Sequence, residues 1–184
     1  MAKITIERIL EKYHKIFVNY PGNPSGVNWT GVPEGWLPII DKLCGSIQEY
    51  IDSVYTLVDN PEYIEGKQFN IDDITTKKYL KQYHPQVTCT QMKEKFGGLR
   101  FYVSHSNDQI NGMIRMAEYL CDHTCDRCGS EENLGVTTGW ISVCCKDCAI
   151  KEGRDLGKSW MTKDQLKQRN KDGQGSTSLK QSDV

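Results

Sequence analysis

The chain has 184 residues, of which 38% are hydrophobic and 26% charged, a balance that suits a soluble globular protein with a modest core. Its formal net charge of −1 is far from the basicity of a dedicated DNA-binding domain. The sequence has no run of the roughly 20 apolar residues that span a bilayer, and its charged start lacks the apolar stretch of a signal peptide. We therefore expect a cytoplasmic protein.

The charge is unevenly distributed along the chain. Residues 1–76 hold 6 Lys and Arg against 11 Asp and Glu, and residues 77–184 hold 17 against 13, so the two parts carry net charges of −5 and +4. This asymmetry permits an anionic partner for the second part.

Two amphipathic helices are expected in the first 60 residues. Apolar residues recur at helical spacing over 5–18 and again over 36–55. The second helix ends at Asn60-Pro61, because proline and the residue before it both resist the helical conformation. Residues 19–26 are rich in Pro, Gly and Asn and predict a loop, and a third, short helix is expected over 71–80.

After residue 85 the apolar pattern changes to period two. Residues 87–95 and 99–104 are rich in β-branched and aromatic residues, and Phe96-Gly97-Gly98 separates them. This pattern predicts a β-hairpin whose glycines supply the positive φ of the turn. The alternation places Cys89, Gln91 and Lys93 on one face. A further helix is expected over 108–122.

The strongest motif is a pair of Cys-x-x-Cys sequences. Cys125 and Cys128 form the first, Cys145 and Cys148 the second, and 16 residues separate them. This spacing is typical of a four-cysteine zinc site, and four thiolates form a closed, structural site. A turn at the first pair, a short hairpin with its second strand at 139–143 and a helix from Lys146 to Lys158 would together look like a treble-clef zinc finger.

Other arrangements of the cysteines compete with this assignment. Cys144 lies beside Cys145, and His123 precedes the first pair by two residues, so either could replace a predicted ligand. We prefer Cys145 because a Cys-x-x-Cys sequence closes around one ion on a first helical turn. A secreted disulfide framework is disfavoured, since the chain is too long and too poor in cysteine.

The tip of the predicted hairpin is a second candidate site. Its two glycines would expose backbone amides among positive charges, a group that could hold a phosphate or carboxylate, with Glu94 as a possible acid or base. The predicted ligand-binding residues are Lys93, Glu94, Lys95, Gly97, Gly98 and Arg100. The simpler alternative is a tight hairpin with solvated charges.

Several of these strings together resemble a family of small proteins from bacteria and tailed phages. The strings are GWLPIIDKLC at 35–44, KEKFGGLRFY at 93–102, Ala117-Glu118, Thr124-Cys125-x-x-Cys128-Gly129, and Gly139-Trp140 before Cys145. The resemblance covers about residues 33–150, and family members often carry histidine where Cys148 stands. This chain departs from the family in its N-terminal extension, its 58–85 segment and its tail. The resemblance implies an architecture and a mobile-element origin, and it implies no reaction.

Together these features predict an α+β protein with three parts. A helical and hairpin domain covers 1–122, a zinc module covers 123–160 and packs on it, and a disordered polar tail covers 161–184. The basic residues expected at the surface of the hairpin and module are Lys93, Lys95, Arg100, Arg127, Lys146, Lys151 and Arg154.

We expect a non-enzymatic accessory or regulatory protein with structural zinc, which binds a nucleic acid or a host protein. One alternative is an enzyme or sequestering protein for a nucleotide-like anionic ligand at the hairpin. Another is a structural part of a virion or larger assembly.

Overall fold

The structure is a computed structural model that describes residues 3–18, 31–59 and 85–172, without the side chains of 55–59. The loop predicted at 19–26 and the helix predicted at 71–80 lie outside the described residues. Within the described ranges, no helix is long and apolar enough to cross a membrane.

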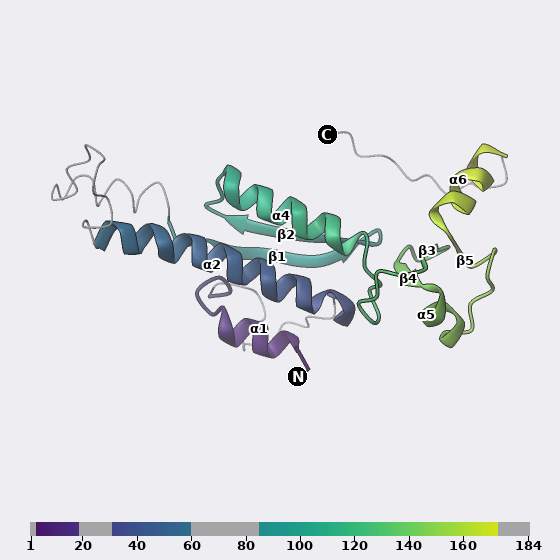
Figure 1. Cartoon of the computed structure of the whole chain (residues 1–184), viewed down its shortest axis with the longest axis horizontal. Coiled ribbons are helices and arrows are strands. Elements are labelled where there is room, and N and C mark those ends of the chain that lie inside the picture. Colours follow the sequence, from purple (N-terminus) through teal and green to yellow (C-terminus); the bar gives the residue numbers. More distant parts are fainter. Residues whose placement is uncertain (1–2, 19–30, 60–84, 173–184) are drawn as a thin grey trace.

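The protein has the predicted α+β architecture, with a β-hairpin packed among helices and a smaller three-stranded module beside it (Figure 1). The elements of the larger part are α1 (Ile6–Lys12), the 3₁₀ turn η1 (Glu34–Trp36), α2 (Leu37–Asp59), β1 (Thr88–Lys95), β2 (Gly98–Ser104) and α4 (Asp108–Cys121). Those of the module are β3 (Leu134–Thr137), β4 (Val143–Cys145), α5 (Lys146–Lys151), β5 (Trp160–Met161) and α6 (Lys163–Lys171).

Helices α2 and α4 pack against each other, and α4 also packs on β2 (Figure 1). The apolar face of α2 is buried from its start to Ile51, with side chains at the i, i+3 and i+4 positions that the sequence predicts. These are Ile40, Leu43, Ile47 and Ile51, and Trp36 of the preceding η1 continues the face. Each such side chain contributes roughly 1.5–3 kcal/mol on burial, so this face holds the larger part together.

The first helix is shorter than predicted. Thr5 caps it, its Oγ1 accepting from the N–H of Arg8, and the helix ends at Lys12. Ile16 and Phe17 are nevertheless buried in the core. The backbone leaves the helix because the carbonyl of Ile16 accepts from the N–H of Cys89 at 2.6 Å, at the start of β1. Pairing with a strand thus replaces the last turns of the predicted helix.

The hairpin forms where the sequence predicts it, with a different turn. Lys95 lies opposite Gly98, so the turn residues are Phe96 and Gly97. Their φ angles are 54° and 80°, both positive as a type I′ turn requires. The positive φ predicted for the glycines therefore falls on Phe96 and Gly97. Gly98 itself has no positive φ, and a Cβ there would lie 2.8 Å from Oδ1 of Asp122, whose side chain would have to move.

A β-bulge interrupts β1 between Cys89 and Gln91. It inserts one residue, so Cys89 and Met92 are both buried while Gln91 is exposed. The predicted strict alternation, which put Gln91 and Lys93 on the face of Cys89, is therefore wrong beyond the bulge.

The module contains an antiparallel sheet in the order β4-β3-β5. Residues 139–142, predicted as strand, form the connection between β3 and β4, with a φ of 83° at Gly139. Helix α5 ends at Lys151 rather than at the predicted Lys158, because Gly153 takes a φ of 69° just after it.

Part of the predicted disordered tail is folded. Met161 lies in β5, and α6 starts with a capping box in which Thr162 and Gln165 satisfy each other's backbone N–H groups. Residues 161–172 are thus folded although the sequence predicts disorder. The capping box starts a helix here even though the segment has no apolar stripe. Residues 173–184 lie outside the described residues.

The residues just before α2 join it to the first cysteine pair. The N–H of Gly35 donates to the carbonyl of Asp126 at 2.9 Å, and the buried Trp36 donates its indole N–H to the carbonyl of Thr124 at 3.2 Å. A Cβ on Gly35 would lie only 2.1 Å from the carbonyl oxygen of Cys125, so glycine is required for this approach. The start of α2 is therefore fixed to the backbone of the cysteine module.

Gly35→Ala tests this junction. The added methyl group must displace the Cys125 backbone, and overpacking of this kind costs about 1–3 kcal/mol of unfolding free energy. Gly112→Ala is the matched control, since a Cβ at this exposed position of α4 meets nothing within 4 Å. That variant should gain roughly 0.5–1 kcal/mol. Urea unfolding measures both, and parent-like stability of Gly35→Ala would contradict the junction.

Candidate metal centre

The four predicted cysteines lie together in the folded chain. Cys125 and Cys128 belong to the turn that follows α4, Cys145 caps α5, and Cys148 lies within that helix. Their Sγ atoms all lie within 4.8 Å of one another. The cluster could therefore hold a metal ion.

The separation of one sulfur pair in the cluster fits tetrahedral coordination by thiolates. With metal–sulfur bonds of about 2.3 Å, as for zinc, sulfur atoms at the corners of a tetrahedron lie about 3.8 Å apart. The Sγ atoms of Cys128 and Cys145 are 3.7 Å apart. The N–H of Cys148 also points to the Sγ of Cys145 at 3.5 Å, so the start of α5 stabilises negative charge on that sulfur.

The turn that carries the first pair is closed by its own backbone. The N–H of Cys125 donates to the carbonyl of Ser130 at 2.7 Å, and the N–H of Gly129 donates back to the carbonyl of Cys125 at 2.9 Å. Gly129 takes a φ of 77°, which favours glycine. The tight turn that the sequence predicts at the first cysteine pair is therefore present.

The thiols of the cluster differ in acidity. Burial opposes ionisation of Cys125, but hydrogen bonding from the backbone of Cys145, Cys128 and Arg127 outweighs it and lowers the pKa of this thiol. Burial raises the pKa of Cys148, and the neighbouring thiols add to the effect. Because a metal binds thiolates, it must displace protons here, and acid must weaken its binding.

Neither competing residue belongs to the cluster. Cys144 is buried in β4 opposite Gly135, on the part of the strand that Trp160 covers, and burial raises its pKa to about 11. His123 is exposed and stacks on Tyr119, with ring centroids 4.3 Å apart. Its Nδ1 lies 2.8 Å from the carbonyl of Tyr119.

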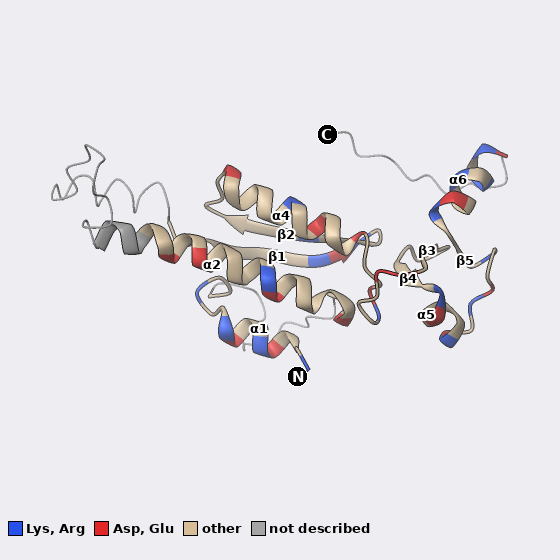
Figure 2. Ribbon diagram, viewed as in Figure 1, with Lys and Arg blue, Asp and Glu red and all other residues tan. Residues whose placement is uncertain are grey.

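Two arginines near the cysteine cluster, Arg127 and Arg154, are paired with carboxylates. Arg127 pairs through Nη1 with Oδ2 of Asp126 and through Nε with Glu152 at 2.7 Å, and Arg154 pairs with the same Glu152 at 3.0 Å. The hydrogen bond from Arg127 is the largest of the effects that lower the pKa of Glu152. The predicted basic surface is therefore partly neutralised, and both signs of charge occur on α5 and α6 (Figure 2).

The hairpin tip already contains its own anion. Oε1 of Glu94 accepts from the N–H of Gly97 at 2.6 Å, so a phosphate or carboxylate would have to displace Glu94 to reach that amide. The basic residues of the hairpin lie nearby but spread out. Lys93 pairs across the ladder with Arg100, and the ammonium of Lys95 lies 5.4 Å from the ring centroid of Phe96.

The hairpin tip and the β3–β4 connection touch each other. A Cβ on Gly97 would lie 3.3 Å from Cγ2 of Ile141 and 3.5 Å from Cα of Ser142. Next to this contact stand two of the most exposed large side chains, Phe96 at 70% and Trp140 at 77%. The sequence pattern does not single out Trp140, because only the fold brings it beside the hairpin.

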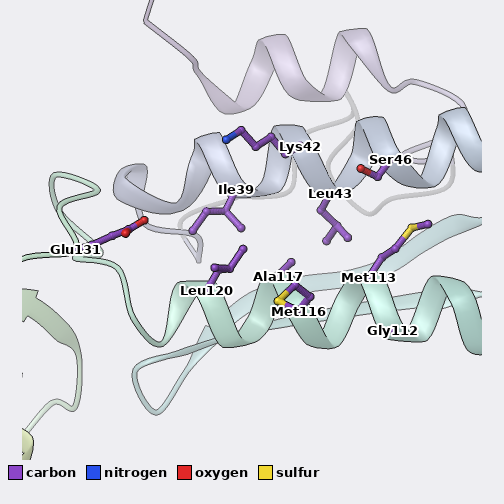
Figure 3. A pocket seen from close by; sticks show the side chains of 10 residues that line it. All are labelled: Ile39, Lys42, Leu43, Ser46, Gly112, Met113, Met116, Ala117, Leu120 and Glu131. Atoms are coloured by element: carbon purple, nitrogen blue, oxygen red, sulfur yellow. The ribbon is translucent and has the colours of Figure 1, made fainter.

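A separate apolar groove of about 550 Å³ lies between α2 and α4. Ile39 and Leu43 point from α2 toward Ala117 and Leu120 of α4 (Figure 3). The groove is lined mostly by aliphatic and methionine side chains, and its polar side chains are those of Lys42, Ser46 and Glu131.

Comparison of the chain with protein-family models, with curated proteins and with solved structures found no match. The functional argument therefore rests on the geometry of the described residues.

Substitution of single cysteines tests the ligand set. Cys145→Ala removes one of the four sulfur atoms that lie together, so we expect the purified, reduced variant to lose most of its bound metal. Cys144→Ala is the matched control one residue away, because its sulfur lies outside the cluster. This control should retain about one ion per chain, as one four-thiolate site predicts. Atomic emission spectrometry measures the metal, and the reverse pattern would assign Cys144 as the ligand.

Proposed function

We propose that the protein is a non-enzymatic, zinc-binding adaptor whose metal is structural. The donor set supports zinc, since four thiolates around one ion form a closed site with no position for a reacting water. Structural zinc contributes about 10–16 kcal/mol of apparent binding free energy in small modules. The ion would therefore fold the cysteine module and hold it against the start of α2.

The observation that carries the adaptor role is the pair of exposed aromatic side chains at the joined tips. Phe96 and Trp140 come from segments more than 40 residues apart in the sequence, yet they flank the contact between Gly97 and Ile141. Large aromatic side chains that stay exposed together are the residues that most often dominate binding between proteins. We name Phe96 and Trp140, with Gly97 and Ile141 between them, the tip surface.

The charge distribution favours a protein partner over a nucleic acid. Binding to phosphates needs cations that are free to replace counterions. Arg127 and Arg154 are instead shared with Glu152, and Lys158 pairs with Asp155 at 3.2 Å. The occupied amide at the hairpin tip likewise disfavours a nucleotide-like ligand there.

The resemblance to small bacterial and phage proteins supports an origin in a phage or mobile element. In that setting the partner would be a host protein in the bacterial cytoplasm, and the adaptor would act as an accessory or regulatory factor.

Loss of partner binding on Trp140→Ala tests the adaptor role. Immobilised zinc-loaded protein is incubated with bacterial lysate, and retained proteins are quantified by mass spectrometry. Truncating a central aromatic residue typically weakens binding by about 2 kcal/mol or more, so partners should be lost from Trp140→Ala and from Phe96→Ala. Tyr119→Ala, which removes an exposed aromatic residue of α4, is the control and should retain them.

A nucleic-acid partner would give a different result. Fluorescence anisotropy measures binding to single- and double-stranded DNA and RNA at several salt concentrations. We expect no salt-sensitive binding to any of them. Steep salt dependence, or the same retained proteins for all three variants, would contradict the proposal.

A further inference from the structure

A small polar cavity lies directly beside the tip surface. It has a volume of about 340 Å³ and lies where residues 31–33, the end of β1, the first cysteine pair and the β3–β4 connection meet. Its side-chain lining comes from Glu94, Asp126, Arg127, Trp140 and Ser142. We name it the carboxylate pocket.

One oxygen of Asp126, a residue that lines this pocket, has no hydrogen-bond partner among the described residues. Its side chain is only 2% exposed, and Oδ2 pairs with Nη1 of Arg127. Oδ1 is buried and has no hydrogen-bond partner. Leaving a buried charged oxygen unsatisfied is expensive, so a donor from outside the chain would stabilise the site.

Arg127 does not supply the missing donor. Its Nη1 also contacts Oγ of Ser142 at 3.1 Å, and its Nε is directed to Glu152 at 2.7 Å. The guanidinium is therefore divided among three acceptors, two of them carboxylates. Asp126 keeps one oxygen that this network does not reach.

A second carboxylate is fixed in the pocket by the hairpin turn. Glu94 is held in place because its Oε1 accepts from the N–H of Gly97. The lining thus has two carboxylates against one guanidinium, and that guanidinium is shared with Glu152 outside the lining. A cation placed here would meet a net negative lining, whereas an anion would be repelled.

Trp140 lines the pocket and is strongly exposed. Its side chain is 77% exposed, while its carbonyl is held by the hydroxyl of Thr137. An indole face that borders a pair of carboxylates attracts a flat cation by both stacking and cation–π attraction. Among protein side chains the guanidinium group is planar and carries several donors, so it suits this combination better than an ammonium.

We propose that the carboxylate pocket binds the guanidinium group of an arginine side chain from the protein partner. Its donors face the carboxylates of Asp126 and Glu94 while its plane lies against Trp140, and a small shift of the lining must open the buried Oδ1 of Asp126 to the incoming donor. This assignment rests on the proposed adaptor role and adds the chemistry by which the partner is recognised.

The test is a titration of zinc-loaded full-length protein with the peptide acetyl-Gly-Arg-Gly-amide at low ionic strength, followed by two-dimensional ¹⁵N NMR. The peptide should shift the indole N–H of Trp140 and the amide of Ser142, with saturation at concentrations on the order of millimolar. The same peptide with neutral citrulline should have an affinity lower by roughly tenfold or more, because it loses the charge-assisted hydrogen bonds. The lysine peptide should also bind more weakly.

Three variants assign the binding to the pocket. Asp126→Asn removes the buried charge, Glu94→Gln keeps the acceptor for the Gly97 amide but removes the second charge, and Trp140→Ala removes the stacking wall. Each should weaken the arginine peptide several-fold, while Tyr119→Ala should not. Asp126 lies between two candidate metal ligands, so Asp126→Asn is compared with the parent protein only if it retains metal and the indole signal of Trp36. Glu94→Gln and Trp140→Ala need no such condition.

Three results would overturn the assignment. The first is the absence of any shift with the arginine peptide. The second is a citrulline or lysine peptide that binds as tightly as the arginine peptide. The third is arginine-peptide binding that is unchanged in both Glu94→Gln and Trp140→Ala.

The titration needs no natural partner, so its outcome is separable from the adaptor role. Peptide binding without any partner lost from Trp140→Ala would contradict the adaptor alone. If Trp140→Ala loses partners but the arginine peptide does not bind the parent protein, the arginine assignment alone would be contradicted.

Discussion

The structure depends on the close approach between Gly35 and the backbone of the first cysteine pair. A hydrogen bond from Gly35 to Asp126 and one from the indole of Trp36 to Thr124 tie the start of α2 to the turn that carries two candidate metal ligands. Because α2 supplies the main apolar face of the larger part, a metal at the cluster would order both parts of the protein. A structural ion would then act well beyond the module that holds it.

The same approach places the hairpin tip beside the module. A Cβ on Gly97 would lie 3.3 Å from Cγ2 of Ile141 and 3.5 Å from Cα of Ser142, so the β3–β4 connection packs on the hairpin tip. Exposed aromatic side chains, the buried Asp126 and the half-buried Glu94 then meet at one junction, although they belong to three separate segments. The tip surface and the carboxylate pocket are both consequences of this packing. Neither exists in the hairpin or in the module alone.

Local structure follows the sequence wherever one interaction dominates. The i, i+3, i+4 pattern of α2 places it correctly, and the Cys-x-x-Cys spacing identifies the four sulfur atoms that meet. The errors arise where a distant contact replaces a local preference. The helix over 5–18 stops early because Ile16 pairs with β1, and the strand alternation fails because a bulge changes the register after Cys89.

The sequence by itself determined the α+β class, the hairpin and the cysteine cluster, because periodicity, turn residues and ligand spacing are local properties of a chain. Only the tertiary structure decided which charges remain free. Arg127 looks like a surface cation in the sequence, and pairing with Asp126 and Glu152 neutralises it. The unpartnered oxygen of Asp126 and the position of Trp140 were equally hidden, because hydrogen bonding and exposure depend on segments that meet only after folding.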